Sequence, residues 1–313
     1  MCSEEYEYLF KLYSQGITNG VPIELISREE ALEIEPSAKI YGDKVIWSPT
    51  TSVASPAEVI EAMRDYVTGH FRNVTIHYDC AYRRILRQGA TTTTLLGGKD
   101  NFEAKYVINS GGLHSHKISR EFGFGHDYYA LPLKGNYLIS ESHNPPFRTL
   151  VYPVPIKGAF FLGVHSTITA DNKVKLGPSL QPAFSSENYR YLEGLNPIET
   201  FDILKVYTRM LFSKQRGLLM RLALHEFPKM SRWYMLRSAL TFHDFDTALF
   251  RKWYKPGIRA QLIRKSSLEI VNDFVLEGDE RSFHVLNAIS PGWTSSFPFS
   301  DHVVGRVKEF IDR

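Results

Sequence analysis

The sequence predicts a mixed α/β (α+β) fold, in which an α/β layer of the nucleotide-binding type is interrupted by a second, mainly antiparallel sheet domain. Strand and helix patterns alternate up to about residue 127, whereas residues 131–180 consist of short aromatic strands. From residue 282 onward the chain ends on a strand, a Pro-Gly turn and a helix. This closing motif is expected to return the chain to the first layer.

Composition limits the classes of protein that the chain can represent. Its 313 residues suffice for two interlocked domains, and 43% hydrophobic with 23% charged residues is typical of a folded globular protein. A net charge of +3 is too small to indicate a nucleic-acid partner, and none is expected. Cys2 and Cys80 cannot form a disulfide framework, which favours a reducing compartment. No apolar run approaches the ~20 residues that span a bilayer.

Helices are predicted where capping residues precede amphipathic stretches. The first 16 residues have helical spacing and do not resemble a signal peptide. Ser27 and Glu30 form a capping box, and the helix that they open should stop at Pro36. Ser55-Pro56 starts the next helix, with proline at its first position.

The remaining elements follow from alternation and from glycine. Strands are predicted in VTIHYDCAYRRIL and TTTTLLGG, and KDNFEA is predicted to be a charged turn. KYVINSGG is a strand that ends in paired glycines and leads into the helix LHSHKISREFG. A basic helical stretch covers roughly 198–240, and AQLIRK, EIVNDFVLEG and SFHVLNAIS alternate like strands before the last helix.

The turn in NAISPGWTSSF precedes a helix whose first turn is rich in hydroxyl groups. Such a helix start presents unpaired N–H groups and the positive end of the helix dipole to whatever lies beside it. Gly292 would let a ligand approach the backbone closely. A Pro-Gly turn that only caps the last helix is the alternative.

Several of these segments resemble one known family. YVINSGGLHSHKISREFG is similar to the strand-turn-helix of the FAD-dependent oxidoreductases related to D-amino-acid oxidase. LPLKGNYLIS, LVYPVPIKGAFFLGVHSTI, KLGPSLQPAF, YKPGIRAQL and HVLNAISPGWTSSF resemble, in the same order, blocks of its L-2-hydroxyglutarate dehydrogenase/oxidase branch. The resemblance implies FAD as cofactor and oxidation of a 2-hydroxy acid to the 2-oxo acid. It also implies a mitochondrial location, with the cytoplasm otherwise expected.

One family feature does not occur in the 313 residues, namely the G-x-G-x-x-G turn that binds the cofactor's diphosphate. The resemblance therefore implies an incomplete, truncated FAD-binding Rossmann-like layer, formed by residues 54–127 and 283–313. The substrate domain would comprise residues 20–53 and 128–282. We expect the chain alone to bind little FAD.

The resemblance also implies cofactor-binding residues in two turns. In the first, after the strand KYVIN, these are Asn109, Gly111 and Gly112. In the second they lie near the flavin ring and are Ser290, Gly292, Trp293 and Thr294, of which Trp293 is bulkier than the small residue expected there. Oriented N–H groups at the second turn would stabilise the negative charge of reduced flavin.

Arg259 and His165 are the predicted catalytic residues. Arg259 lies in a G-I-R turn where relatives bind the substrate carboxylate, and a guanidinium can hold a carboxylate through two hydrogen bonds. His165, in GVHST, is suited to accept the hydroxyl proton because imidazole titrates near neutral pH. A surface arginine and a histidine satisfied within a strand are the alternatives. Lys134 and Tyr137 are predicted to bind substrate as well.

The chain departs from the family pattern at several positions. Lys134 and Asn136 stand where the family usually has Arg and Glu. Ile168 stands where Arg is common, and His116 where Asp is usual. Residues 51–55 stand where the family has a turn similar to Thr-Gly-Ile-Val-Asp. These changes remove groups that would bind a dicarboxylate. A non-catalytic paralogue or fragment, acting as a binding or assembly subunit, is therefore the alternative to the enzyme.

Two further features carry weaker predictions. His114 and His116 lack the ligand set of a metal site, so no metal is expected. The basic helical stretch 204–237 could contact a membrane surface or a protein partner, although such a pattern is more often a helix with one buried and one solvated face.

Overall fold

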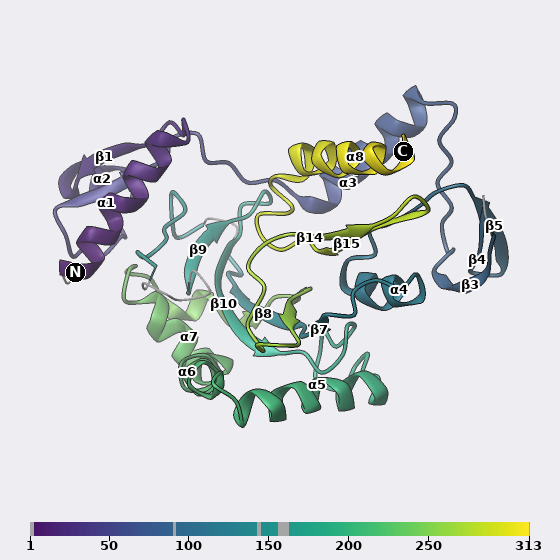
Figure 1. Cartoon of the computed structure of the whole chain (residues 1–313). Coiled ribbons are helices and arrows are strands. Elements are labelled where there is room, and N and C mark those ends of the chain that lie inside the picture. The colour runs from purple at the N-terminus through teal and green to yellow at the C-terminus, as the bar shows by residue number, and fades with distance from the viewer. Residues whose placement is uncertain (1–2, 90–91, 143–144, 156–162, 313) are drawn as a thin grey trace. The chain divides into compact units, whose positions relative to one another are not determined.

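The structure is a computed structural model, and it describes residues 3–89, 92–142, 145–155 and 163–312. The chain packs as two compact units (Figure 1). The first unit comprises Met1–Phe71, Gly135–Gln181 and Leu222–Pro256, and the second unit comprises Arg72–Lys134, Pro182–Arg221 and Gly257–Arg313. The domain boundaries expected from the sequence stay a prediction, because these units are defined by packing alone.

The first unit combines a small two-stranded N-terminal sheet, a larger sheet and several helices. Its elements are α1 (Ser3–Thr18), β1 (Glu24–Ser27), α2 (Arg28–Ile34), β2 (Lys44–Trp47), α3 (Pro56–His70), β8 (Leu133–Ile139), β9 (His165–Ile168), β10 (Val174–Pro182), η2 (Phe227–Met230), α7 (Arg232–Ala239), η3 (Thr247–Leu249) and β11 (Lys252–Trp253). The first residues of β8 and the last of β10 cross into the second unit, and α6 (Arg216–Glu226) spans the boundary.

The second unit holds the remaining elements. These are β3 (Tyr82–Gln88), β4 (Thr93–Gly97), β5 (Asp100–Ala104), β6 (Val107–Asn109), η1 (Gly112–His114), α4 (Ser115–Glu121), β7 (Tyr128–Ala130), α5 (Pro197–Leu211), β12 (Gly257–Arg259), β13 (Leu262–Arg264), β14 (Val275–Gly278), β15 (Ser282–Asn287) and α8 (Ser296–Ile311).

The predicted start signals of the first unit's helices are confirmed. Ser27 accepts a hydrogen bond from the Glu30 N–H while the Glu30 carboxylate accepts from the Ser27 N–H, so the capping box is complete. The Ser55 hydroxyl likewise caps α3, with Pro56 at the first helical position. Because the donors and acceptors of both motifs are close neighbours in the chain, the sequence alone predicts where these helices begin.

The core of the first unit lies where its larger sheet, in the order β11-β8-β10-β9, meets α7. Leu138, Val174 and Leu176 are fully buried on the strands, and they share a cluster with Met235 and Ala239 of α7. Antiparallel pairing of β9 with β10 agrees with the predicted antiparallel sheet. Alternating burial along β10 is the pattern of a strand with one face toward the core.

The second unit contains the predicted α/β layer. Its sheet has the order β14-β15-β6, and the parallel pairing of β15 with β6 returns the C-terminal segment to the earlier strand, as predicted for the closing motif. Val303 and Val307 of α8 pack on Phe283 and Val285 of β15. Figure 1 shows α8 running along this sheet. The mixed α/β fold class is therefore confirmed.

The basic stretch 204–237 is not one helix but parts of α5 and α7 with all of α6 and η2. α5 packs Ile203, Val206 and Met210 against β7 and β13, so one face of it is buried. α7 also buries one face, whereas α6 buries none of its residues. A partner or membrane contact through this stretch stays a prediction.

Two local predictions are wrong. KDNFEA, predicted as a turn, turns only at its start and forms β5, because its backbone pairs with β4. In VTIHYDCAYRRIL only the last part is a strand, β3, since the first part lacks a pairing partner among the described strands. Two parts of the sequence analysis lie outside the described residues: Cys2, and residues 156–162 of the segment LVYPVPIKGAFFLGVHSTI that resembles the family. Cys80 is a half-buried free thiol. Among the described helices none has the length and apolarity of a membrane span.

Candidate functional site

The first predicted cofactor turn connects β6 to α4, and Asn109 organises it. The Asn109 side chain is buried; its carbonyl oxygen accepts the Gly111 N–H at 3.1 Å, and its amide donates to the Ser115 carbonyl oxygen at 2.8 Å. A Cβ on Gly111 would lie 2.9 Å from the Ile118 side chain, and Gly112 has φ +54°, which favours glycine. Asn109 thus shapes the turn, while the exposed Gly111 and Gly112 present backbone to solvent.

The second predicted cofactor turn, Ser290–Thr294, precedes α8. A Cβ on Gly292 would lie 2.8 Å from the Ile289 carbonyl oxygen and 2.9 Å from that of Ala288, so the turn itself requires this glycine. The hydroxyls of Thr294 and Ser295 donate back to the Pro291 carbonyl oxygen, and Ser295 does not cap the helix. In the first turn of α8 the Ser296 N–H donates to the Trp293 carbonyl oxygen and the Phe299 N–H to that of Ser295, and Pro298 has no N–H, so the helix start offers an anion mainly the positive end of its dipole.

His165 begins β9 in the first unit and is partly buried. Its Nδ1 lies 3.1 Å from the Gly163 carbonyl oxygen, and its ring stacks on Tyr152 with 4.3 Å between ring centroids. Because a carbonyl can only accept, Nδ1 carries the proton and Nε2 keeps its lone pair. Burial lowers the pKa of His165, opposed by the bond to Gly163, so the ring is neutral near pH 7.

The other predicted substrate residues have varied surroundings. Arg259 ends β12 and Tyr137 lies on β8, and both side chains are partly buried. Lys134 is buried, and its ammonium donates to the Asn188 carbonyl oxygen at 3.1 Å; burial lowers its pKa. Asn136, which stands where the family usually has Glu, donates to the Ser179 hydroxyl at 3.3 Å.

A narrow cavity in the second unit lies beside the β6–α4 turn. Gly112 and Leu113 line it from that turn, and Ala260 and Gln261, which follow Arg259, line it from the other side. Gln261 is buried, and its amide donates to the carbonyl oxygens of Leu262 and Val271. Gly112, a predicted cofactor residue, thus lines the same cavity as Ala260, which follows the predicted carboxylate-binding residue Arg259.

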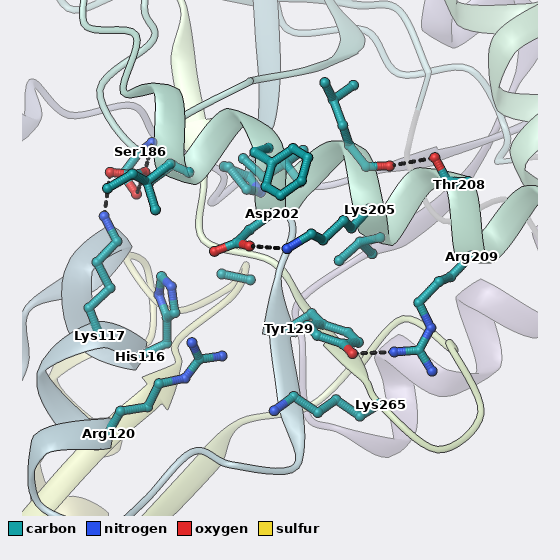
Figure 2. A pocket seen from close by; sticks show the side chains of 18 residues that line it. His116, Lys117, Arg120, Tyr129, Ser186, Asp202, Lys205, Thr208, Arg209 and Lys265 are labelled. Carbon is teal, nitrogen blue, oxygen red and sulfur yellow. Dashed lines mark hydrogen bonds and ion pairs between the residues drawn. The ribbon is translucent and has the colours of Figure 1, made fainter.

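A larger cavity of about 820 Å³ adjoins the narrow one, and His116 lines both. Figure 2 shows His116, Lys117 and Arg120 on α4 facing Arg209 on α5, with Tyr129 and Lys265 between the two helices. Burial, then the charges of Arg120 and Lys117, lower the pKa of His116 to about 4. His116 is therefore neutral at physiological pH.

The two histidines of the H-x-H motif have different surroundings. His114 pairs with Glu187 at 2.8 Å, and His116 points into the large cavity. No cluster of three metal-ligand side chains occurs in the described part of the chain. Sequence reasoning did not find the cationic residues of that cavity, because Arg120, Arg209 and Lys265 are far apart in the chain and no motif links them.

Comparison with known proteins identifies the family. Residues 1–304 match the family model described as "FAD dependent oxidoreductase". The chain is 26% identical over 313 residues to an L-2-hydroxyglutarate dehydrogenase of Escherichia coli, covering 98% of this chain and 71% of that protein. It is 28% identical over 323 residues to the mitochondrial L-2-hydroxyglutarate dehydrogenase of Dictyostelium discoideum, covering 96% and 70%.

Solved structures show the same fold. The L-α-glycerophosphate oxidase of Mycoplasma pneumoniae superposes with a TM-score of 0.65 at 17% identity, covering all of this chain and 71% of that one. A glycine oxidase of Bacillus cereus superposes with a TM-score of 0.58 at 14% identity, covering 97% of this chain and 71% of that one. At these identities the likeness concerns the fold alone.

The residues present fit the ring end of FAD. The start of α8, which no side chain caps, and the exposed turn before it present the positive end of the helix dipole, which suits the electron-rich pyrimidine side of a flavin. The glycines of the β6–α4 turn leave room for a ligand beside the backbone. A glycine-rich diphosphate turn is not among the 313 residues.

Proposed function

The chain belongs to the family of FAD dependent oxidoreductases, whose cofactor is FAD, and from this premise we propose that it oxidises a 2-hydroxy acid of the L-2-hydroxyglutarate type to the 2-oxo acid. The observation that carries the proposal is the similarity to L-2-hydroxyglutarate dehydrogenases along 94–98% of the chain. FAD, when bound, supplies the acceptor for the hydride that leaves the substrate carbon. The chain's own residues bind the acid, orient it and move its proton.

His165 is the proposed base. Oxidation of an alcohol carbon to a carbonyl removes the hydroxyl proton, and a neutral imidazole with a free lone pair can accept it. The bond from Nδ1 to Gly163 and the stacking on Tyr152 fix the ring and direct the lone pair to Nε2. The lowered pKa of His165 keeps this form populated at neutral pH.

Arg259 is the proposed partner of the substrate's carboxylate. A planar guanidinium can donate two parallel hydrogen bonds to one carboxylate, which orients the adjacent C–H as well as binding the charge. Tyr137 is proposed to contact the substrate too. For Lys134 we propose a supporting role, because its ammonium is buried against the Asn188 carbonyl oxygen.

The two glycine-containing turns are proposed to contact the flavin. Gly111 and Gly112 would lie beside it through their exposed backbone, with Asn109 holding the turn in shape. Ser290, Gly292, Trp293 and Thr294 would place the start of α8 toward the negative end of the reduced ring.

The test is an oxidation assay with purified protein, added FAD and an artificial electron acceptor. L-2-hydroxyglutarate should yield 2-oxoglutarate, measured directly as product, whereas the D enantiomer should not. A monocarboxylic acid such as L-lactate serves as the matched control for the second carboxylate. If flavin binds, as followed by its visible absorbance, and no 2-hydroxy acid is oxidised, the proposed reaction is wrong.

A mitochondrial location is proposed as well. The relatives of Dictyostelium discoideum and Homo sapiens are named as mitochondrial enzymes, whereas the Escherichia coli relative has no such compartment. Fractionation of cells that express the native gene, followed with an antibody against this chain, tests it. Recovery in the cytosol alone would contradict the proposal.

A further inference from the structure

The large cavity of the second unit has features of a binding site that the proposed reaction does not use. Its volume of about 820 Å³ lies within the range of roughly 300–1,000 Å³ that small-molecule pockets occupy. Four parts of the chain form it: the segment from α4 to Pro132 just after β7, Ser186 in the segment before α5, the length of α5, and Lys265 after β13. Because all of them belong to the second unit, its geometry is internal to one compact body.

The cavity carries more positive than negative charge. Five cationic side chains line it, together with the carboxylates of Glu199 and Asp202. Glu199 pairs with Lys117, and Asp202 with Lys205 at 3.4 Å. The three other cations, Arg120, Arg209 and Lys265, form no ion pair with any carboxylate in the described part of the chain.

These three cations act on one another electrostatically. Burial, then the charges of Arg120 and Arg209, lower the pKa of Lys265, and only Asp127 acts in the opposite direction. Repulsion among like charges around a cavity is relieved when an anion enters, so each of the three cations would favour the bound state.

The cations are also held in place by the protein. Arg209 donates to the Tyr129 hydroxyl, and Arg120 donates to the Tyr128 carbonyl oxygen at 3.2 Å. The Lys265 ammonium lies over the Tyr129 ring, 5.2 Å from its centroid. Because these contacts already restrict the side chains, binding an anion would cost less conformational entropy than at a mobile surface cluster.

The cavity also has apolar side chains, on the same helix α5 that carries Arg209. Ile198 and Phe201 of α5 line it, and their side chains are 75% and 62% exposed. The Lys205 ammonium lies over the Phe201 ring, 4.1 Å from its centroid. A ligand that contacts both the cations and these apolar side chains would therefore combine a concentrated negative charge with an apolar body.

We propose that this cavity binds a small organic phosphate, with Arg120, Arg209 and Lys265 on the phosphate group and Ile198 and Phe201 against its organic part. A phosphate monoester dianion places three oxygens and about two charges in one group, which suits three cations that surround one space. A dicarboxylate separates its charges along a chain and suits the cavity less well.

The experiment measures binding of phenyl phosphate to the purified protein by isothermal titration calorimetry at constant ionic strength. Benzoate has the same apolar ring with a single charge, and glutarate has two separated carboxylates, so they are the matched ligands. We expect saturable binding of phenyl phosphate and at least about tenfold weaker binding of the other two, a difference of about 1.4 kcal/mol. Equal or tighter binding of glutarate, or no saturable binding of phenyl phosphate, would overturn the proposal.

Variants show whether the cavity is responsible. Lys265→Gln and Arg209→Gln should each weaken phenyl phosphate binding by about tenfold or more, the effect of losing one charge-assisted hydrogen bond. The control is Arg264→Gln, which removes the same charge from the neighbouring, exposed residue outside the cavity and should change the affinity less than about twofold. Circular dichroism and thermal melting identify any variant that fails to fold. An equal loss in the control would mean that diffuse charge, and not the cavity, holds the ligand.

Discussion

The buried histidine network of the first unit should make that unit sensitive to mild acid. His243 is fully buried, stacks on Phe147 with 3.8 Å between ring centroids, and lies 2.9 Å from the hydroxyls of both Ser37 and Ser166. Burial lowers the pKa of His243 from 6.5 to about 4, although the charge of Glu35 opposes this. The folded state therefore resists protonation of a group that the unfolded state protonates readily.

The magnitude follows from linkage between protonation and folding. The unfolded chain binds the proton with a pKa of 6.5 and the folded chain with a pKa of about 4. The free energy of unfolding therefore keeps its full value above pH 6.5 and decreases as the pH falls below it. Between pH 7 and pH 5 the loss from His243 is about 2 kcal/mol. The hydrogen-bonded carboxylate of Glu35, whose pKa is lowered from 4.5, contributes at lower pH and does not interfere in this window.

The assay is urea unfolding at pH 7 and pH 5, followed by tryptophan fluorescence, because Trp47, Trp233 and Trp253 belong to the first unit. His243→Gln keeps a polar side chain without the titration. This variant should be less stable than the parent at pH 7, by about 1–3 kcal/mol, since a buried network is broken. Its further loss between pH 7 and pH 5 should be smaller than that of the parent by about 2 kcal/mol.

The control is Leu138→Ala, which opens a cavity in the same core without removing a titrating group. It should destabilise the unit by about 2–5 kcal/mol at both pH values. If His243→Gln loses as much stability between pH 7 and pH 5 as the parent does, the buried neutral histidine is not the source of acid sensitivity. The reasoning from burial to pKa would then be refuted.

Three further predictions concern the proposed site. His165→Gln should reduce turnover of a 2-hydroxy acid by about 10²–10⁴ without loss of flavin absorbance, because glutamine cannot accept the proton; unchanged turnover would remove His165 from the mechanism. Arg259→Lys should raise the KM by about 10–100-fold, since the two-bond contact to the carboxylate is lost, and steady-state kinetics with wild-type KM would contradict its role. Gly292→Ala should lower the free energy of unfolding by about 1–3 kcal/mol, because the added Cβ would lie 2.8 and 2.9 Å from two carbonyl oxygens. Thermal melting of the variant and the parent measures the difference, and an unchanged melting temperature would contradict the close packing of this turn.

Motifs that act over a few residues were readable from the sequence. The capping box at Ser27 and Glu30 and the proline start of α3 formed as predicted, since their donors and acceptors are neighbours in the chain. The blocks that resemble the FAD-dependent oxidoreductases also led to the correct family and fold class, because a family's motifs record its fold as well as its chemistry.

The sequence could not separate a residue's role in the site from its role in the fold. Asn109 and Gly292 were predicted to bind the cofactor, and both also stabilise local structure. Asn109 forms hydrogen bonds within the β6–α4 turn, and Gly292 packs closely against carbonyl oxygens of its own turn. The functional assignments of these residues stay predictions. Only the contacts around a side chain show which of its groups are already used.

Local pattern and family likeness, then, determined the elements, the fold class and the two turns that could face a flavin. Tertiary structure decided which distant residues share one space. KDNFEA is not such a case, because β5 pairs with β4 across the two-residue turn Gly98-Lys99, a local hairpin that the prediction of a turn alone missed. Arg120, Arg209 and Lys265 surround one cavity, and His243 is enclosed by residues from three separate segments. Electrostatic energy and burial depend on distance in space, and for residues so far apart in the chain that distance is set only when the chain packs.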